Sequence, residues 1–224
     1  MANLIRTALK KCIDGEKGLL NREEEAVKAV FEGLVIGGVA MAFAGVSRPA
    51  SGVEHYFSHV FDMRGLAFNT NVDLHGIQCA VGTYIASGLY EKVLTVTPDK
   101  EKALSYARNF DFNAWAEELK VFLGKGADAM IALEEKEGKY DLSKHAKRLD
   151  IIIDKWEEIK AIIREEIPSK AEIEEILTLI GAPKTIQEIG VECDLDLALK
   201  ATKDIRDKYV LSRLLWDLGL IEEF

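Results

Sequence analysis

The chain has 224 residues, of which 48% are apolar and 30% are charged. This composition can build a buried core, so it excludes a disordered or collagen-like chain. Acidic residues outnumber basic ones by 38 to 29, which argues against nucleic-acid binding because that requires the opposite charge. The three cysteines are widely spaced and form no C-x-x-C pair, as is typical of a reducing cytoplasm. We therefore expect a folded cytoplasmic protein.

The N-terminal part predicts two helices. Residues 3–13 place apolar side chains at helical spacing, and Gly15 ends this helix. Asn21 is placed to cap a second helix, which should stop near Gly45 and contains the longest apolar run of the chain, residues 34–46. A run of this length is too short to cross a bilayer, which takes about 20 residues. We therefore expect no membrane span and a helix that is buried on all sides.

The rest of the chain also predicts helices. Ser51 and Glu54 match an S-x-x-E capping box, which places a helix start at Ser51, and Asp73 is placed to cap the next helix. Further amphipathic helices are predicted at 99–108, 111–124, 126–137, 142–165, 169–180, 184–190, 194–207 and 209–218. The one strand candidate, residues 93–97, is short, and no Gly-rich strand–turn–helix unit for a nucleotide is present. The predicted fold is an all-α multi-helix bundle.

Three of the four histidines lie close together in the sequence. His55 and His59 are four residues apart on one helix face, and His75 lies in the first turn of the next helix. A helix N-terminus carries partial positive charge, which favours the neutral imidazole that binds a metal. Two facing helix starts could bring the three rings to one cation. The competing interpretation is a chance H-x3-H pair, and the third histidine raises the metal hypothesis to about even with it.

The remaining ligands stay open. Cys79 lies four residues after His75, so a His–His–His–Cys set is conceivable, although a buried small apolar role for Cys79 is favoured. A catalytic site would need a carboxylate. The nearby acids Glu54, Asp62 and Asp73 have competing roles in helix capping or on a solvated surface, so none is an unambiguous ligand.

A loop of small residues, S-R-P-A-S-G at 47–52, precedes the first histidine helix. Such a loop can bind an anion through backbone N–H groups, with Arg48 clamping a phosphate. The alternative, slightly favoured on these residues alone, pairs Arg48 with a neighbouring acid. Elsewhere, His145 is predicted at the surface, the charged run 134–139 on a solvated face, and the three tryptophans in the core.

Residues 41–83 closely resemble the sn-glycerol-1-phosphate dehydrogenases, within the wider group of iron-containing alcohol dehydrogenases, glycerol dehydrogenases and dehydroquinate synthases. S-R-P-A-S-G, then E-H-x3-H, then H-G-x-Q with a downstream V-G-T stand in the family order and at the family spacing. The resemblance continues more weakly to both ends and covers the helical C-terminal half of the family fold. It implies that residues 1–224 are a single metal- and substrate-binding domain without the N-terminal dinucleotide-binding domain.

The resemblance implies one divalent metal, usually zinc and in some members iron or nickel, held by two histidines and an aspartate. The histidines correspond to His55 and His75, and the aspartate to a segment preceding this chain. His59 corresponds to a proton-relaying histidine, the catalytic assignment here, while Arg48 and Ser51 are substrate-side candidates. The metal acts as a Lewis acid while hydride passes between NAD(P) and the substrate, interconverting dihydroxyacetone phosphate and sn-glycerol 1-phosphate. Family members are commonly dimers or larger oligomers.

Because the dinucleotide domain is missing, we expect the chain alone to transfer no hydride. It would be an excised domain, or a protein that has lost its partner half or recruits it in trans. Two other hypotheses remain. One is a non-catalytic helical module that binds a metal or a partner chain. The other is a dehydroquinate-synthase-like lyase domain, which is less favoured because that group lacks S-R-P-A-S-G and usually has glycine where this chain has Glu54 and Ser58.

Overall fold

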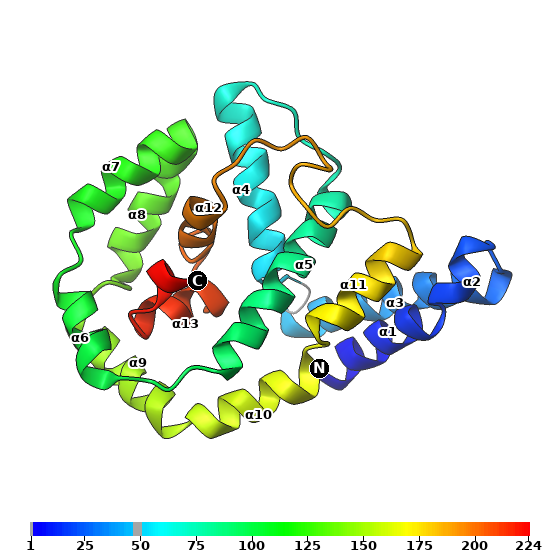
Figure 1. Ribbon diagram of the computed structural model, residues 1–224, viewed down its shortest axis with the longest axis horizontal. Coiled ribbons are helices and arrows are strands. Elements are labelled where there is room, and N and C mark those ends of the chain that lie inside the picture. The colour runs from blue at the N-terminus through cyan, green and yellow to red at the C-terminus, as the bar shows by residue number, and fades with distance from the viewer. Residues whose placement is uncertain (1, 47–50) are drawn as a thin grey trace.

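A computed structural model describes residues 2–46 and 51–224 of the chain. These residues form an all-α fold without any strand, as predicted (Figure 1). The helices are α1 (Ala2–Asp14), α2 (Glu16–Leu20), α3 (Glu24–Ala44), α4 (Val53–Phe68), α5 (His75–Leu94), α6 (Lys100–Arg108), α7 (Phe112–Leu123), α8 (Ala127–Glu137), α9 (Leu142–Asp154), α10 (Trp156–Glu166), α11 (Lys170–Leu179), α12 (Leu195–Thr202) and α13 (Leu211–Asp217).

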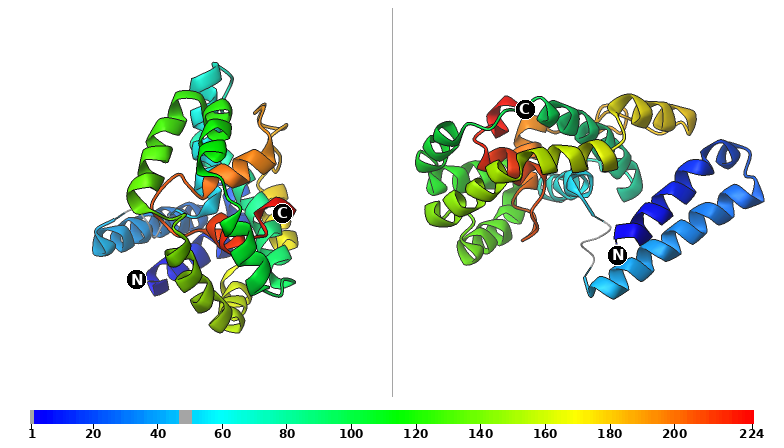
Figure 2. Two further views of the ribbon diagram at one scale, coloured as in Figure 1. Left: turned by 90° about the vertical axis from the view of Figure 1, so that its left-hand side faces the viewer. Right: turned by 90° about the horizontal axis from the view of Figure 1, so that it is seen from below.

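Helices α1–α3 form an arm that stands off the remaining helices (Figure 2). Within the arm, α1 packs along α3 at Gly33, where a Cβ atom would lie 2.7 Å from Cys12 Sγ and 3.0 Å from the Ala8 carbonyl oxygen. Glycine is therefore needed for this close approach. Arg6 of α1 donates from Nε to both carboxylate oxygens of Glu166 at 2.9 Å, which ties the arm to α10.

The expectation that α3 is buried on all sides is wrong. Phe43 is 79% exposed, Leu34 70% and Phe31 67%. The arm explains this difference, since α3 packs mainly against α1 and α2, and no other described element contacts α3 to a comparable extent. The helix ends at Gly45 with φ +66°, as predicted, and has 21 residues. It is therefore long and apolar enough to span a bilayer by length and composition, a test that core helices and N-terminal signal sequences also pass.

The core of the remaining helices, α4–α13, is built around α4 and α5. Phe57, Val60 and Phe61 of α4 are at most 1% exposed. The two helices approach closely at Gly82 of α5, where a Cβ would lie 2.5 Å from the Glu54 carbonyl oxygen. The tryptophans at 115, 156 and 216 are all buried, as predicted. This packing fixes the relative position of the two helices that carry the clustered histidines.

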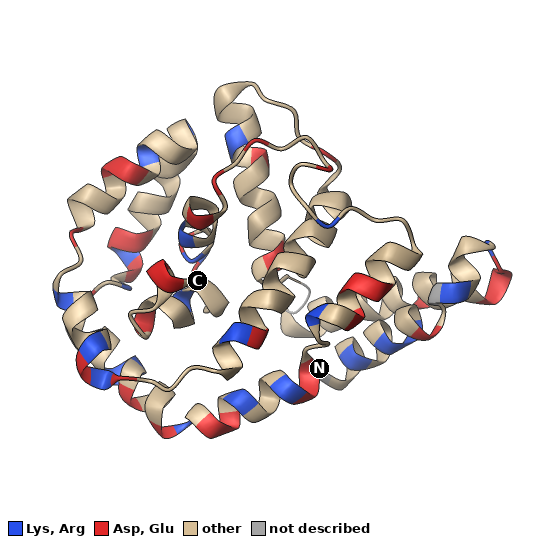
Figure 3. Cartoon of the chain, in the orientation of Figure 1, with Lys and Arg blue, Asp and Glu red and all other residues tan. Residues whose placement is uncertain are grey.

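Several predicted elements differ from those observed. The predicted helix 142–165 is two helices, α9 and α10, separated at Lys155. Residues 184–190 contain turns rather than a helix, and the strand candidate 93–97 is the end of α5, a turn at Thr95 and two residues without regular structure. Residues with charges of both signs follow one another along α10 (Figure 3), and Glu157, Glu158 and Arg164 of this helix are exposed.

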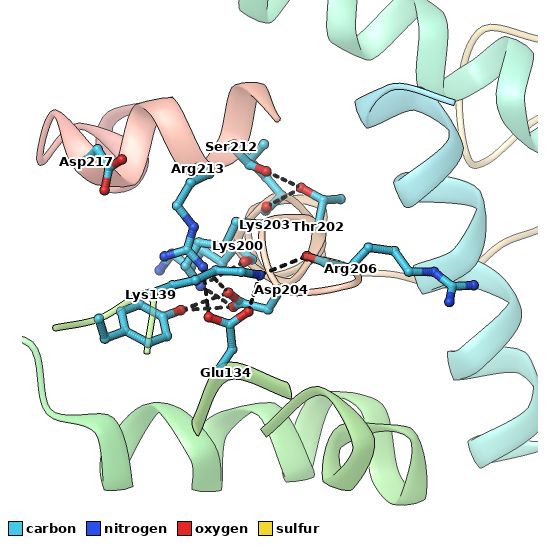
Figure 4. Close-up of polar contacts among 12 residues, drawn as sticks. Glu134, Lys139, Lys200, Thr202, Lys203, Asp204, Arg206, Ser212, Arg213 and Asp217 are labelled. Carbon is cyan, nitrogen blue, oxygen red and sulfur yellow. Dashed lines mark hydrogen bonds and ion pairs between the residues drawn. The ribbon is translucent and has the colours of Figure 1, made fainter. Parts of the chain in front are cut away.

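Two polar residues predicted on the surface are buried. His145 is fully buried, with Nε2 2.9 Å from the Asp217 carbonyl oxygen. Glu134 is 1% exposed and belongs to a buried cluster that we call the ion network (Figure 4). Its members are Glu134, Lys139, Lys203, Asp204 and Arg213.

The ion network joins α8, α13 and the chain around α12. Arg213 Nη2 lies 2.6 Å from Asp204 Oδ1 and 3.2 Å from Glu134 Oε2. Lys203 Nζ lies 2.5 Å from the second oxygen of Asp204, and the Tyr140 hydroxyl donates to the same carboxylate at 2.9 Å. Because opposite charges pair, the side chains can be buried, which a run of charged letters in a sequence does not reveal.

Candidate metal and substrate site

The two helices that carry the clustered histidines begin slightly later than predicted. Helix α4 begins at Val53, and its Glu54 accepts a hydrogen bond from the backbone N–H of Gly52 at 2.7 Å, so Ser51 is not the cap. Helix α5 begins at His75, after Leu74. The Asp73 side chain accepts a hydrogen bond from the Leu74 backbone N–H at 2.6 Å and does not cap the start of α5. Both corrections are small, and the histidines remain in or near the first turns.

The rings of His55, His59 and His75, which we call the histidine cluster, lie next to one another. The ring centroids of His55 and His75 are 4.4 Å apart, those of His55 and His59 are 4.7 Å apart, and those of His59 and His75 are 5.8 Å apart. Close packing at Gly82 brings the start of α4 alongside the first turns of α5. Imidazoles from two helices therefore face one small volume.

Donor atoms of three side chains are spaced as ligands of one ion would be. His55 Nδ1 lies 3.2 Å from His75 Nε2, and Cys79 Sγ lies 3.6 Å from His75 Nε2 and 3.9 Å from His55 Nδ1. Tetrahedral zinc places two nitrogen ligands about 3.3 Å apart and a nitrogen and a sulfur about 3.6 Å apart, given its usual bond lengths. In the described residues these three form the one group with metal-ligand spacing. Cys79 is half-buried and faces the rings, unlike the apolar role favoured from sequence.

A chain of hydrogen bonds sets the orientation and tautomer of His75. Gln78 donates from Nε2 to Asp62 Oδ1 at 2.8 Å, so its carbonyl oxygen accepts from the Ser58 hydroxyl at 3.3 Å. Ser58 Oγ then accepts from His75 Nδ1, 2.7 Å away. The proton on Nδ1 leaves a lone pair on Nε2, the nitrogen that faces His55. Such an outer hydrogen bond is the usual support of a metal-binding histidine.

The surroundings of His55 and His59 favour the neutral form of both rings. Burial lowers the pKa of His55, and the neighbouring His75 lowers it further. Burial also lowers the pKa of His59, with a smaller contribution from His55. Neutral imidazole has a free lone pair, so at neutral pH these rings are in the form that a cation requires. Burial raises the pKa of the Cys79 thiol, so Cys79 is protonated at neutral pH, and a bound cation would favour its thiolate.

No described acid joins the three donors. Asp62 Oδ2 lies 4.0 Å from His75 Nδ1, which is the nitrogen turned away from His55. The Glu54 carboxylate is occupied by the Gly52 N–H. The described residues thus supply two nitrogens and one sulfur on one side of the position that a cation would take.

A polar pocket of about 390 Å³ opens beside the rings. Its lining joins residues that are far apart in sequence: Val46, Ser51, His55, Tyr56, His59, Arg206, Asp207 and Lys208. Of the predicted substrate-side residues, Ser51 lines this pocket and its carbonyl oxygen accepts from Lys208 Nζ. Arg48 lies outside the described residues. Sequence reasoning missed Arg206 and Lys208, because no spacing rule connects them to a helix start about 150 positions earlier.

Comparison with known proteins bears on this site. Over 93% of its length the chain is 23% identical to a glycerol-1-phosphate dehydrogenase [NAD(P)+] of Halalkalibacterium halodurans. Shorter stretches of 67 and 63 residues are each 51% identical to enzymes of the same name from Thermococcus sibiricus and Archaeoglobus fulgidus. The chain is therefore similar in sequence to part of the glycerol-1-phosphate dehydrogenases. This finding confirms the resemblance seen in the sequence.

The match covers only part of these glycerol-1-phosphate dehydrogenases. The chain spans 42% of the length of the Halalkalibacterium halodurans enzyme, and the 51% identical stretches span 18% and 17% of the other two enzymes. No model of a known protein family matches the chain. The similarity therefore supports the family, while the activity of the whole enzymes remains a proposal for this chain.

Proposed function

We propose that residues 1–224 are the helical metal- and substrate-binding domain of an NAD(P)-dependent glycerol-1-phosphate dehydrogenase. The observation that carries this proposal is the convergence of His55 and His75, whose facing nitrogens are 3.2 Å apart. The relatives' name supports the substrate and the cofactor class. In this proposal the nicotinamide nucleotide is bound by a part of the enzyme outside these residues. The protein is cytoplasmic and works as a homo-oligomer.

In this proposal, different residues around the site have different roles. His55 Nδ1 and His75 Nε2 hold the divalent cation, zinc in our proposal, and the Ser58–Gln78 hydrogen bonds keep His75 in the required tautomer. When bound, the cation supplies Lewis-acid polarisation of the substrate oxygen. An aspartate from outside the chain would add a ligand, as the family resemblance implies.

His59 is the proposed proton-transfer residue. Its ring lies 4.7 Å from that of His55, lines the pocket, and falls outside the group with metal-ligand spacing. Because burial lowers its pKa, the ring is neutral at neutral pH and can accept the proton of a substrate hydroxyl. In the reverse direction the protonated ring returns that proton to the carbonyl oxygen.

Zinc affinity tests the metal half of the proposal. We expect His55→Ala and His75→Ala each to lose more zinc affinity than the roughly 10- to 100-fold that removal of an outer partner costs. Affinity would be measured by competition with a chromophoric chelator at neutral pH. His59→Ala is the matched control and should lose far less. Wild-type protein that binds zinc no better than His55→Ala would refute the proposal.

Joining the chain to the N-terminal part of a glycerol-1-phosphate dehydrogenase tests the activity. The fusion should oxidise NADH or NADPH with dihydroxyacetone phosphate, and the same fusion with His59→Ala should bind zinc but turn over slowly. A fusion that binds zinc and nicotinamide nucleotide, yet never oxidises it with this substrate, would favour a non-catalytic metal-binding module. Turnover of a different substrate class would favour a lyase of the dehydroquinate synthase type.

A further inference from the structure

We propose that Arg206 and Lys208 bind the phosphate group of a phosphate monoester in the pocket beside the histidine cluster. This inference rests on the proposed function and assigns the recognition of its substrate class to a segment that sequence reasoning had passed over. The segment follows α12 and precedes α13. The phosphate contact is thus separate from the residues that would hold the metal.

The pocket places both cations where a small ligand would meet the rings. Arg206 and Lys208 line the same cavity of about 390 Å³ as His55 and His59. Figure 4 shows the Arg206 side chain leaving the ion network and extending toward α4. Lys208 Nζ donates to the Ser51 carbonyl oxygen, which fixes the ammonium group at the pocket wall. A volume of a few hundred Å³ fits a ligand with a few carbons and one phosphate.

The segment that carries the two cations is anchored by buried groups. Lys139 Nζ donates to the Arg206 carbonyl oxygen at 2.8 Å and also pairs with the buried Glu134. Asp204, two residues earlier, is fully buried in the ion network. Arg206 itself is exposed, so its backbone is held while its guanidinium is open to a ligand. Anchoring of this kind lowers the ordering entropy that binding would otherwise cost.

The electrostatic balance in the pocket favours an anion. Arg206 and Lys208 bring two positive charges to the lining that holds His55 and His59. Asp207 brings one negative charge to the same lining. The Glu54 carboxylate is bound to the Gly52 N–H, at the positively polarised start of α4. Two cations therefore face the pocket together with one lining acid.

The two side chains suit the two parts of phosphate recognition. A guanidinium can donate two parallel hydrogen bonds to phosphate oxygens, while an ammonium acts as a point charge. Arg206 would set the orientation of the phosphate, and Lys208 would add charge from the Ser51 side. The carbon chain of the ligand would then extend toward His55 and His59.

Binding of glycerol 1-phosphate to metal-free protein tests this assignment. We expect isothermal titration calorimetry to show that Arg206→Gln weakens binding roughly 10- to 100-fold, the loss typical of one charge-assisted contact. Arg206→Lys should fall between wild type and Arg206→Gln, because it keeps the charge but loses the paired donors. Arg108→Gln, an exposed arginine of α6, is the control and should bind as wild type. Glycerol, which lacks the phosphate, should bind far more weakly than glycerol 1-phosphate.

The outcomes separate this inference from the proposed function. Equal binding of glycerol 1-phosphate by wild type, Arg206→Gln and Lys208→Gln would overturn the phosphate assignment while leaving zinc binding intact. If the wild-type protein did not bind zinc, the proposed function would be refuted whatever the result with glycerol 1-phosphate. Because Arg206 is exposed, its variants should unfold at the wild-type urea concentration, which excludes misfolding as the cause of lost binding.

Discussion

The histidine cluster and the ion network are both polar, but their side chains are arranged in opposite ways. In the ion network, Arg213, Glu134 and Asp204 are each at most 2% exposed, and the guanidinium pairs with both carboxylates. In the histidine cluster, His55 is half-buried and His75 is exposed, and their facing nitrogens lie 3.2 Å apart. In the network each charged group lies beside an opposite charge, although Arg213 Nε and Nη1 have no hydrogen-bond partner among the described residues. The cluster instead presents donor atoms toward a shared position.

The difference suggests which polar clusters serve stability and which serve binding. Buried ion pairs such as those of the ion network hold helices together. A ligand that bound among them would have to break these ion pairs. Neutral metal-ligand side chains that converge beside an open pocket are not required for folding, since each helix could form without them. The residues between the two regions, around Arg206, belong to both, because their backbone is held by the network and their side chains line the pocket.

The largest expected effect comes from breaking the ion network. Arg213→Met should lower the free energy of unfolding by about 3–5 kcal/mol, because it leaves Glu134 and Asp204 buried without their shared guanidinium. Urea unfolding followed by circular dichroism would measure this loss. Arg108→Met, at an exposed position, should change stability by less than about 1 kcal/mol. If Arg213→Met lost less than about 1 kcal/mol of stability, the ion network would not be needed for the fold.

A smaller effect should connect packing to the histidine cluster. Gly82→Ala forces a Cβ to within 2.5 Å of the Glu54 backbone oxygen, so α4 and α5 must move apart. We expect a loss of about 1–3 kcal/mol in stability, as for other overpacked positions, together with weaker zinc binding. Gly38→Ala in α3 is the matched control, since nothing lies within 4 Å of its Cβ. This control should be stabilised by about 0.5–1 kcal/mol with zinc affinity unchanged.

The smallest predicted effect is alkaline destabilisation. Burial raises the pKa of Tyr90 to about 12, and burial and Asp204 raise the pKa of Tyr140 well above its ordinary value of 10. Since an unfolded tyrosine ionises near pH 10, the folded state holds more protons above that pH, and stability falls as the pH rises. Tyr90 alone should contribute a loss of about 1 kcal/mol by pH 11.

Two measurements at pH 9, 10 and 11 would check this effect. Urea unfolding should give a lower free energy at each step, and absorbance at 295 nm should show part of the tyrosines still protonated at pH 11. Stability that is flat or rising over this range would contradict the burial of these hydroxyls. In Arg213→Met the Tyr140 signal should shift toward higher pH, because the nearby guanidinium lowers the pKa of that hydroxyl and the variant removes it.

The local parts of this structure could be predicted from the sequence, and the long-range parts could not. Helical periodicity predicts an all-α fold, and the spacing of His55, His59 and His75 predicts rings on two adjacent helix starts. The same periodicity makes α3 apolar without showing that its neighbours cover only one face. Charge alone also suggests a surface position for Glu134, whose burial depends on partners up to about 80 positions away.

The candidate site shows the same limit. The histidines are local to α4 and α5, so their spacing reveals them, whereas Arg206 and Lys208 reach the pocket only through the tertiary packing of the C-terminal segment. Cys79 was within reach of sequence reasoning, because it lies one helical turn after His75. Its side chain faces the rings owing to the close packing at Gly82, which no single spacing encodes.

The location of His55 and His75 on separate helices has a thermodynamic consequence. A cation shared by both rings would bridge α4 and α5, so unfolding would require its release. The midpoint of thermal unfolding would then depend on free metal, with about 1.4 kcal/mol gained for every tenfold rise in concentration above the dissociation constant. Heating the protein across a series of metal buffers would thus report occupancy of the bridge without any substrate.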